Sequence, residues 1–212
     1  LRLVNSGKLG GVPAKAMQLL QVAESNSKRL GRLINDLLDV EKLASGKFQL
    51  TLEVQPLQPL VKQAIDEITS YAEHYNVSLV ADYASELLLA KVDAPRFVQI
   101  VTNLLSNAIK FSPRDSVVMV TVSRVADAIR VTVQDQGQGV AEHFVPRLFS
   151  RFSQADSADQ RQHSGTGLGL AISRSLISQM QGNMGYQPAP GHGSCFYFEL
   201  PFIAALQPKQ LP

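Results

Sequence analysis

The sequence of 212 residues contains no tryptophan, one cysteine and few charged residues, and these shortages exclude several classes of protein. A single thiol, Cys195, cannot close a disulfide within the chain or supply the several thiolates of a structural metal site. We expect it to be buried and reduced. Charged side chains make up 18% of the residues and leave a net charge of +2. Because no basic cluster is present, nucleic acid and charged membranes are not expected partners.

Long apolar runs are also missing from the sequence. No stretch approaches the roughly 20 apolar residues that a membrane-spanning helix needs, and no secretory signal is visible. The chain begins at Leu1 without a methionine, so we interpret it as part of a longer protein. We expect this part to lie in the cytoplasm, and the sequence is compatible with a longer parent protein that is anchored in the inner membrane.

A long helix is predicted over residues 13–45, because Pro13 suits a first helical turn and Gly46 suits a helix end. Small or apolar residues recur every seven positions, at Ala16, Ala23, Leu30, Leu37 and Ala44. This spacing is typical of a coiled coil over about four heptads. Residues 1–46 therefore predict a truncated helical hairpin that dimerises, with its turn at residues 6–11.

After Gly46 the pattern changes to a period of two, which predicts a strand from Phe48 to Val54. Further strands are predicted at 77–82, 87–92, 117–125, 128–135, 183–187 and 194–200, and helices at 56–75, 94–110 and 167–181. This mixture favours an α+β fold, a two-layer α/β sandwich whose mixed, mainly antiparallel sheet is covered by helices on one face. We expect a partial hairpin at 1–46, a globular domain at 47–203 and a tail at 204–212.

Asn103, Asn107 and Lys110 share one face of the helix predicted over residues 94–110. Two amide oxygens beside an ammonium group suit a Mg²⁺–phosphate unit, because Mg²⁺ prefers hard oxygen ligands, water and phosphate. A polar stripe exposed to solvent explains the same spacing, and taken alone this segment favours that interpretation.

Three segments with glycines follow along the chain. Asp135, Gly137 and Gly139 come after a strand, where the carboxylate can accept from an exocyclic amine and the glycines admit a ligand to the backbone; a tight turn is an equal alternative. Residues 165–173 run from a loop into a helix whose first N–H groups can bind an anion; a flexible hinge is the alternative. They match neither the P-loop nor the dinucleotide pattern. Residues 191–196 alone indicate a hairpin turn.

The order and spacing of these four segments resemble the N, G1, G2 and G3 boxes of the catalytic domain of sensor histidine kinases of two-component systems. Residues 148–154 look like the F box of that family, and residues 33–46 are similar to the second helix of its dimerisation and phosphotransfer domain. The resemblance covers residues 1–202 and implies a Bergerat-type ATP-binding fold with ATP and Mg²⁺ as cofactors.

The resemblance also implies a role for each matching residue. Asn107 binds Mg²⁺ with Asn103 beside it, and Lys110 faces the phosphates. Asp135 takes the adenine amino group in a pocket shaped by Gly137 and Gly139. Residues 140–166 form a mobile ATP lid, organised by Phe149 and Phe152. Main-chain N–H groups reach the phosphates from Thr166, Gly167, Leu168 and Gly169.

The implied activity is that of a protein histidine kinase, which passes the γ-phosphoryl group of ATP to a histidine for relay to a response-regulator aspartate. Hydrolysing relatives carry a glutamate where Asn103 stands, and an amide cannot act as a base. The implied partners are a second copy, through the hairpin, and a receiver domain. The acceptor is expected upstream of Leu1, since none of the histidines has its context: His74, His143, His163 and His192.

Two alternatives remain open on the sequence alone. One is a hydrolysing ATPase of the same superfamily, which Asn103 argues against. The other is a nucleotide-free interaction module that mainly dimerises, which the full set of nucleotide-contacting residue types argues against.

Overall fold

The chain divides into two compact units, one ending at Phe48 and the other beginning at Gln49. The structure is a computed structural model, and it describes residues 13–44, 48–153 and 166–204. The turn predicted at residues 6–11 and the helix end predicted at Gly46 lie outside the described residues. Among the residues that the structure does describe, no helix is both long enough and apolar enough to span a bilayer.

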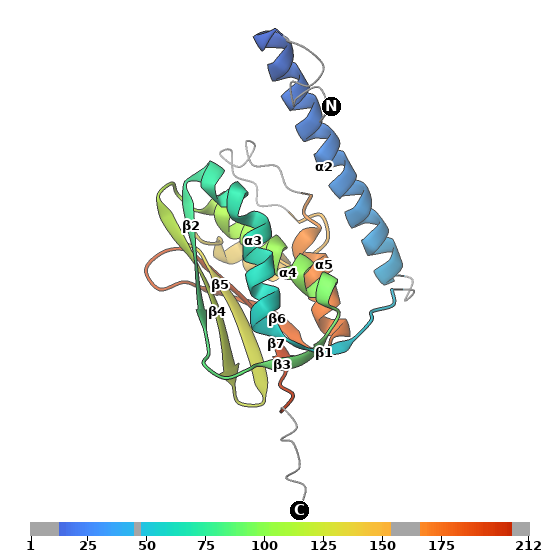
Figure 1. The fold of residues 1–212 in the computed structure, drawn as a ribbon, viewed down its shortest axis with the longest axis vertical. Coiled ribbons are helices and arrows are strands. Elements are labelled where there is room, and N and C mark those ends of the chain that lie inside the picture. The colour runs from blue at the N-terminus through green and yellow to red at the C-terminus, as the bar shows by residue number, and fades with distance from the viewer. Residues whose placement is uncertain (1–12, 45–47, 154–165, 205–212) are drawn as a thin grey trace, which may run out of the picture. The chain divides into compact units, whose positions relative to one another are not determined.

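The first unit is the helix α2 (Ala14–Ala44), drawn in blue in Figure 1. It starts directly after Pro13, whose carbonyl accepts the first helical hydrogen bond from the Met17 N–H group at 3.0 Å, so the predicted helix is confirmed. Two leucines of the heptad stripe, Leu30 and Leu37, expose 58% and 48% of their surfaces. These two side chains are therefore exposed among the residues that the structure describes.

The second unit is built on a five-stranded sheet in the order β2-β4-β5-β7-β6. Its strands are β2 (Val77–Tyr83), β4 (Ser116–Val125), β5 (Ala128–Gln134), β6 (Asn183–Pro188) and β7 (Ser194–Pro201). Only β2 and β4 run parallel, and the other neighbours are antiparallel. The predicted mixed, mainly antiparallel sheet is therefore confirmed.

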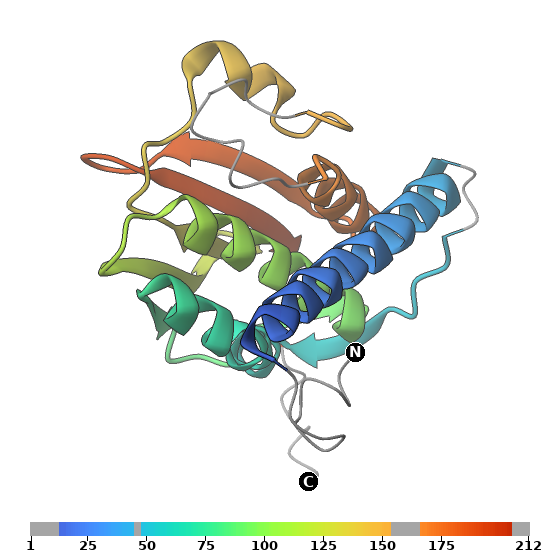
Figure 2. The same cartoon turned by 90° about the horizontal axis from the view of Figure 1, so that it is seen from above.

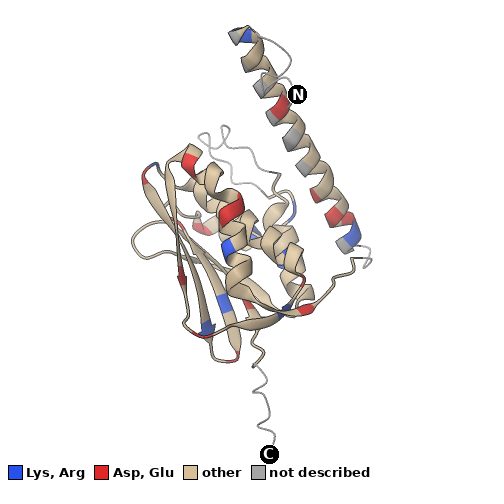
Figure 3. Ribbon diagram, in the orientation of Figure 1, with Lys and Arg blue, Asp and Glu red and all other residues tan. Residues whose placement is uncertain are grey.

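Three helices cover one face of this sheet, as Figure 2 shows: α3 (Leu57–Tyr75), α4 (Ala94–Phe111) and α5 (Gly169–Gln179). Alternate residues of the central strands point into the layer between sheet and helices and are fully buried, among them Val118, Val120, Ile129 and Val131. The predicted two-layer sandwich is confirmed. Lys and Arg are scattered among Asp and Glu over these elements (Figure 3).

Helix α4 lies between α3 and α5 and forms the centre of the helical layer (Figure 1). Asp93 caps its N-terminus, because the Asp93 side chain accepts a hydrogen bond from the Arg96 N–H group at 3.1 Å. Its buried side includes Phe97, which meets Phe198 of β7 edge to face with ring centroids 5.6 Å apart. This packing leaves one side of α4 to carry polar residues.

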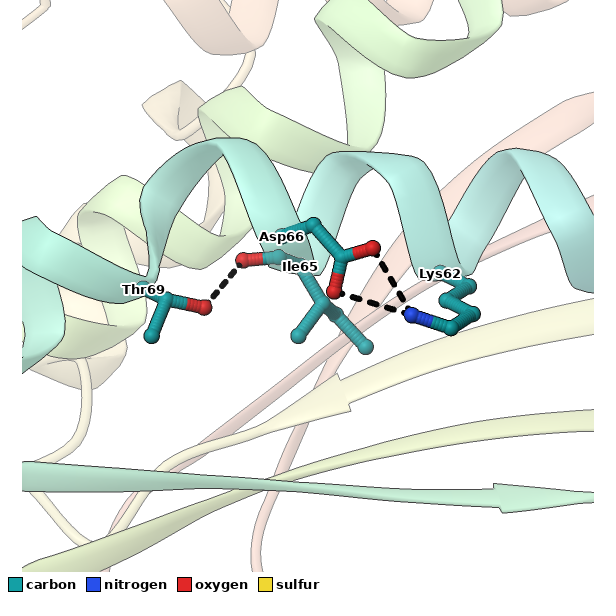
Figure 4. Close-up of polar contacts among 4 residues, drawn as sticks. All are labelled: Lys62, Ile65, Asp66 and Thr69. Carbon is teal, nitrogen blue, oxygen red and sulfur yellow. Dashed lines mark hydrogen bonds and ion pairs between the residues drawn. The ribbon is translucent and has the colours of Figure 1, made fainter.

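The outer surface of α3 is polar and exposed. Lys62 pairs with Asp66 at 2.8 Å, and Thr69 donates to the Ile65 carbonyl at 2.8 Å (Figure 4). Both members of the ion pair expose more than half of their side chains, so the pair contributes little to stability. This face is a solvated surface and supplies useful control positions.

The prediction of a strand over residues 48–54 was wrong about where the strand begins. The observed strand β1 (Glu53–Pro56) pairs with β3 (Leu89–Val92) in a separate two-stranded ribbon. Pairing ends where Glu53 faces Val92, the last residue of β3. Before that point the Thr51 N–H group donates to the Asp93 carboxylate at 3.0 Å. The alternation of apolar residues begins at Phe48, but β3 is too short to pair with the residues before Glu53.

Other elements also differ from the prediction in their bounds. Helix α5 begins at Gly169, because Gly167 has a φ of +69° and lies outside the helical region. Within the predicted lid, residues 140–166, lies a short 3₁₀ helix, η1 (Glu142–Arg147). His143 lies in this helix and His74 lies near the end of α3.

Candidate nucleotide-binding site

Asp135 follows strand β5 directly and is a buried residue, with 3% of its surface exposed. Its Oδ1 accepts hydrogen bonds from the main-chain N–H groups of Gly137 at 2.8 Å and Ser194 at 3.0 Å. Burial raises the pKa of this carboxyl, and the bonds from Gly137 and Ser194 oppose the shift. Both main-chain bonds use Oδ1, and the Ser194 side chain adds a further hydrogen bond to this carboxyl.

Two glycine turns close around Asp135. A Cβ on Gly193, whose φ is +117°, would overlap the Asp135 carbonyl oxygen. Gly139, whose φ is +78°, approaches the Gly193 carbonyl, which a Cβ would meet at 3.3 Å. The fourth predicted segment, interpreted alone as a hairpin turn, therefore also supports the aspartate.

Gly137 brings this aspartate segment to the C-terminal end of α4. A Cβ on Gly137 would overlap the main-chain carbonyl oxygen of Phe111, the last residue of α4. Only a residue without a side chain fits this approach. The sequence placed Gly137 in an adenine pocket through the resemblance, and the structure shows which element it touches.

The polar face of α4 carries Asn103, Asn107 and Lys110, all half-buried, while neighbouring Leu104, Leu105 and Ile109 are buried in the core. The predicted shared face is confirmed, and its burial differs from that of a fully solvated stripe. The Lys110 ammonium group lies 4.6 Å from the centre of the Phe111 ring. Burial lowers the pKa of Lys110 below its ordinary value.

The glycine turn before α5 meets α4 at Asn103. A Cβ on Gly169 would overlap the Asn103 carboxamide oxygen and lie 2.9 Å from its Cγ and Nδ2 atoms. On the other side, the Asn103 Nδ2 group donates to the Ser173 hydroxyl oxygen at 3.0 Å. The Asn103 carboxamide is thus held by α5.

Within the glycine turn, the Leu168 N–H group donates to the Thr166 hydroxyl oxygen at 3.2 Å. In this arrangement that N–H is engaged inside the turn, while the Leu168 side chain is buried. Gly167 packs against the backbone of Phe152, its Cβ position lying 3.0 Å from the Phe152 Cα. The segment that resembles the F box therefore contacts the segment that resembles the G2 box.

Two turns of α4 connect these contacts. Asn103, Asn107 and Phe111 succeed one another at intervals of four residues, so they follow one side of the helix over about 12 Å. Gly169 touches this side at Asn103 and Gly137 touches it at Phe111, which leaves Asn107 between them. The structure thus brings three of the predicted segments together along α4.

Parts of the predicted site lie outside the described residues. They comprise residues 154–165, which are the later part of the predicted lid and include His163 and Gly165. Of the two phenylalanines expected to organise the lid, Phe149 lies 5.3 Å from the Arg174 guanidinium of α5, and Phe152 is exposed with a φ of 58°. A ring held on α5 ties the start of this loop to the helix that follows it.

The contacts of two serines that support the site were not predicted from the sequence. Ser194 pairs with Asp135 through the antiparallel register of β5 and β7, in which Gln134 lies opposite Cys195. Ser173 binds Asn103. Both serines lie in segments that the sequence singles out, residues 165–173 and 191–196, but no local pattern predicts their contacts, because each contact joins distant parts of the chain. Cys195 is buried and free, as expected.

A magnesium ion at this site would depend on amide and phosphate oxygens. No cluster of three or more His, Cys, Asp or Glu side chains suited to a metal occurs among the residues that the structure describes. The half-buried Asn107 lies between the two glycine contacts, and its carboxamide oxygen is a hard ligand of the kind that Mg²⁺ accepts beside phosphates and water. The residues present therefore fit a Mg²⁺ ion that is bound mainly by the phosphates of a nucleotide and by the Asn107 carboxamide.

Residues 92–204 match the family described as "Histidine kinase-, DNA gyrase B-, and HSP90-like ATPase". The chain is 36% identical over 196 residues to the sensor protein GacS of Pseudomonas syringae pv. syringae, covering 90% of this chain and 22% of GacS. It is 32% identical over 186 residues to the signal transduction histidine-protein kinase BarA of Escherichia coli K12, covering 85% of this chain and 20% of BarA.

The solved structure of full-length ShkA in complex with AMPPNP matches with a TM-score of 0.78 at 29% identity, covering 93% of this chain and 41% of ShkA. The chain therefore belongs to the histidine kinase-, DNA gyrase B- and HSP90-like ATPase family, as the ATP-binding catalytic domain of a sensor histidine kinase. The resemblance noted in the sequence is confirmed. The chain spans about a fifth of the length of GacS and BarA.

Proposed function

We propose that this chain binds ATP with Mg²⁺ along α4 and transfers the γ-phosphoryl group to a histidine of its parent protein, for relay to the aspartate of a response regulator. The observation that carries this proposal is the contact of α4 with Gly137 at one end and with Gly169 two turns earlier. One helix thereby connects a base-binding carboxylate with a phosphate-binding turn.

Asp135 recognises the adenine base in this proposal. Two main-chain N–H groups hold its Oδ1, so the carboxylate has a fixed position from which it accepts a hydrogen bond from the exocyclic amino group. A hydrogen bond to a charged acceptor is stronger than a neutral one. Gly137 and Gly139 keep side chains out of the space beside the carboxylate.

The phosphates lie between the polar face of α4 and the turn Thr166–Gly169. Asn107 and Asn103 provide amide oxygens on the metal side, and Lys110 provides positive charge. The turn provides main-chain N–H groups at the start of α5, where the helix dipole favours an anion. Bound Mg²⁺ would neutralise charge on the phosphates.

The chain's own residues supply positioning and charge rather than a base. Asn103 occupies the place of the water-activating glutamate of hydrolysing relatives, and a carboxamide does not accept a proton at neutral pH. Phosphoryl transfer depends chiefly on alignment and electrostatic stabilisation. These properties favour transfer to a positioned histidine over hydrolysis.

The whole protein is proposed to act as a homodimer through the hairpin to which α2 belongs, in the cytoplasm and with a receiver domain as partner. The exposed leucines Leu30 and Leu37 support this proposal, because a stripe at heptad spacing is stabilised by burial against another helix. The domain division at residues 1–46, 47–203 and 204–212 stays a prediction of the same account.

A fluorescent ATP analogue, titrated with and without Mg²⁺, tests nucleotide binding. We expect saturable binding that Mg²⁺ strengthens, and we expect Asn107→Ala to remove the strengthening by Mg²⁺. Lys62→Ala on the exposed face of α3 is the matched control and leaves binding unchanged. Absence of binding would support the interaction module, and rapid release of inorganic phosphate would support the hydrolysing ATPase.

A further inference from the structure

We propose that Ser173 is a positioning residue of the nucleotide site, an inference that rests on the proposed function. Its hydroxyl holds the Asn103 carboxamide against the first residue of α5. Asn103 thereby sets the distance between the glycine turn and the polar face of α4. The glycine turn and the polar face of α4 are thereby kept at the separation that the phosphates need.

Ser173 behaves differently from its neighbour on the same helix. Ser175 donates its hydroxyl proton to the carbonyl of Ala171, four residues earlier, at 3.0 Å, which is the usual bond of a helical serine. Ser173 is 2% exposed, and its Oγ accepts from Asn103 Nδ2 at 3.0 Å. This bond joins two helices through residues that are 70 positions apart.

The bond from Ser173 fixes which way the Asn103 carboxamide faces. Because Nδ2 donates to the serine, Oδ1 stays beside Gly169, where a Cβ would overlap it. The plane of the amide therefore lies directly against the α5 backbone. The Asn103 carboxamide, placed between Ser173 and Gly169, therefore sets the spacing of α4 and α5.

This arrangement controls the phosphate end of the proposed site. The N–H groups of the turn and the oxygen of Asn107 have to face the same phosphates, and Asn103 sets their separation. Without the serine hydroxyl, the half-buried Nδ2 group loses its acceptor, which is unfavourable. The carboxamide then turns, and the register of α4 and α5 relaxes. The Asp135 end, next to Phe111, is unaffected.

The matched pair Ser173→Thr and Ser173→Val tests the proposal in the full 212-residue chain. Threonine and valine have nearly the same shape, so both add the same volume, but only threonine keeps a hydroxyl. We expect the valine variant to bind ATP with Mg²⁺ about three- to tenfold more weakly than the threonine variant. We expect both to bind adenosine equally.

Ser175→Ala is the control, because the Ser175 hydroxyl donates to a carbonyl of its own helix. We expect this variant to bind ATP with Mg²⁺ as tightly as the wild type. Equal affinity of the threonine and valine variants for ATP with Mg²⁺ would overturn the inference, as would equal losses for ATP and adenosine. Absence of ATP binding by the unsubstituted chain would instead contradict the proposed function.

If the added methyl group prevents both variants from folding, Ser173→Ala and Asn103→Ala provide a second test. The two changes remove the same hydrogen bond, so their effects on affinity for ATP with Mg²⁺ should not add: the double variant should bind about as weakly as Asn103→Ala alone. Fully additive losses would overturn the assignment of Ser173 to this role.

Discussion

The carboxylate of Asp135 accepts a hydrogen bond from the main-chain N–H group of Ser194, which lies 59 residues further along the chain. A second bond, from Gly137, reaches the same oxygen. The side chain is therefore fixed before any ligand arrives. A recognition group whose orientation is already set loses little conformational freedom on binding, and this relationship defines the base-binding end of the proposed site.

The first prediction concerns Asp135→Asn. Gly137 and Ser194 continue to hold the remaining amide oxygen, which places the new NH₂ group where Oδ2 was. Two donors then face each other when adenine binds. We expect ATP affinity to fall about 10- to 100-fold with little change in melting temperature, as measured by titration and thermal unfolding. Unchanged affinity would show that the base binds elsewhere.

The second prediction concerns pH. Burial raises the pKa of Asp135 above its ordinary value of 3.8, so we expect ATP affinity to fall on acidification at a higher pH than for an ordinary aspartate. The folded state also holds this proton more tightly than the unfolded state. Its contribution to the free energy of unfolding is fully present below pH 3.8 and is lost as pH rises through the raised pKa.

Chemical denaturation of the wild type and of Asp135→Asn across acidic pH measures this contribution. The stability of the wild type relative to the variant should decrease as pH rises through the window. A difference that does not depend on pH would contradict the assigned direction of the shift.

The third prediction concerns Gly169→Ala. The new methyl group would overlap the Asn103 carboxamide, so we expect a loss of about 1–3 kcal/mol in the free energy of unfolding. Gly31→Ala is the control, because nothing lies within 4 Å of its Cβ position in α2, and it should stabilise the helix by about 0.5–1 kcal/mol. In an Asn103→Ala background the cost of Gly169→Ala should shrink. The same cost in both backgrounds would show that the contact does not limit this position.

The fourth prediction concerns Asp93, which caps α4 through the Arg96 N–H group and also accepts from Thr51. Asp93→Ala should lower the free energy of unfolding by about 1–2 kcal/mol, since the cap of α4 is lost. Asp93→Asn keeps an oxygen for the cap and should retain most of the stability. Urea unfolding distinguishes the two, and equal losses would contradict the role of the cap.

Local pattern predicted much of the fold and of the candidate site. The spacing of Asn103, Asn107 and Lys110 fixes their shared face because a helix repeats every 3.6 residues. Apolar periodicity likewise located α2, α4 and the central strands. These features depend on residues that are close in the chain.

Contacts between distant residues could not be predicted in the same way. The bond between Asp135 and Ser194 follows from the register of β5 and β7. The link from Asn103 to Ser173 follows from the packing of two helices. The start of β1 depends on the length of β3, and the start of α5 depends on the left-handed backbone of Gly167. Each is a property of tertiary structure.

The central claim is that one nucleotide extends along α4 from Asp135 to the turn before α5. A crystal structure of the chain with a non-hydrolysable ATP analogue and Mg²⁺ tests it most directly. The account predicts the adenine amino group within hydrogen-bond distance of Asp135 Oδ2, the metal at Asn107 and the phosphates beside Gly169. A nucleotide bound away from α4, or with its base at Asn103 and its phosphates at Asp135, would contradict it.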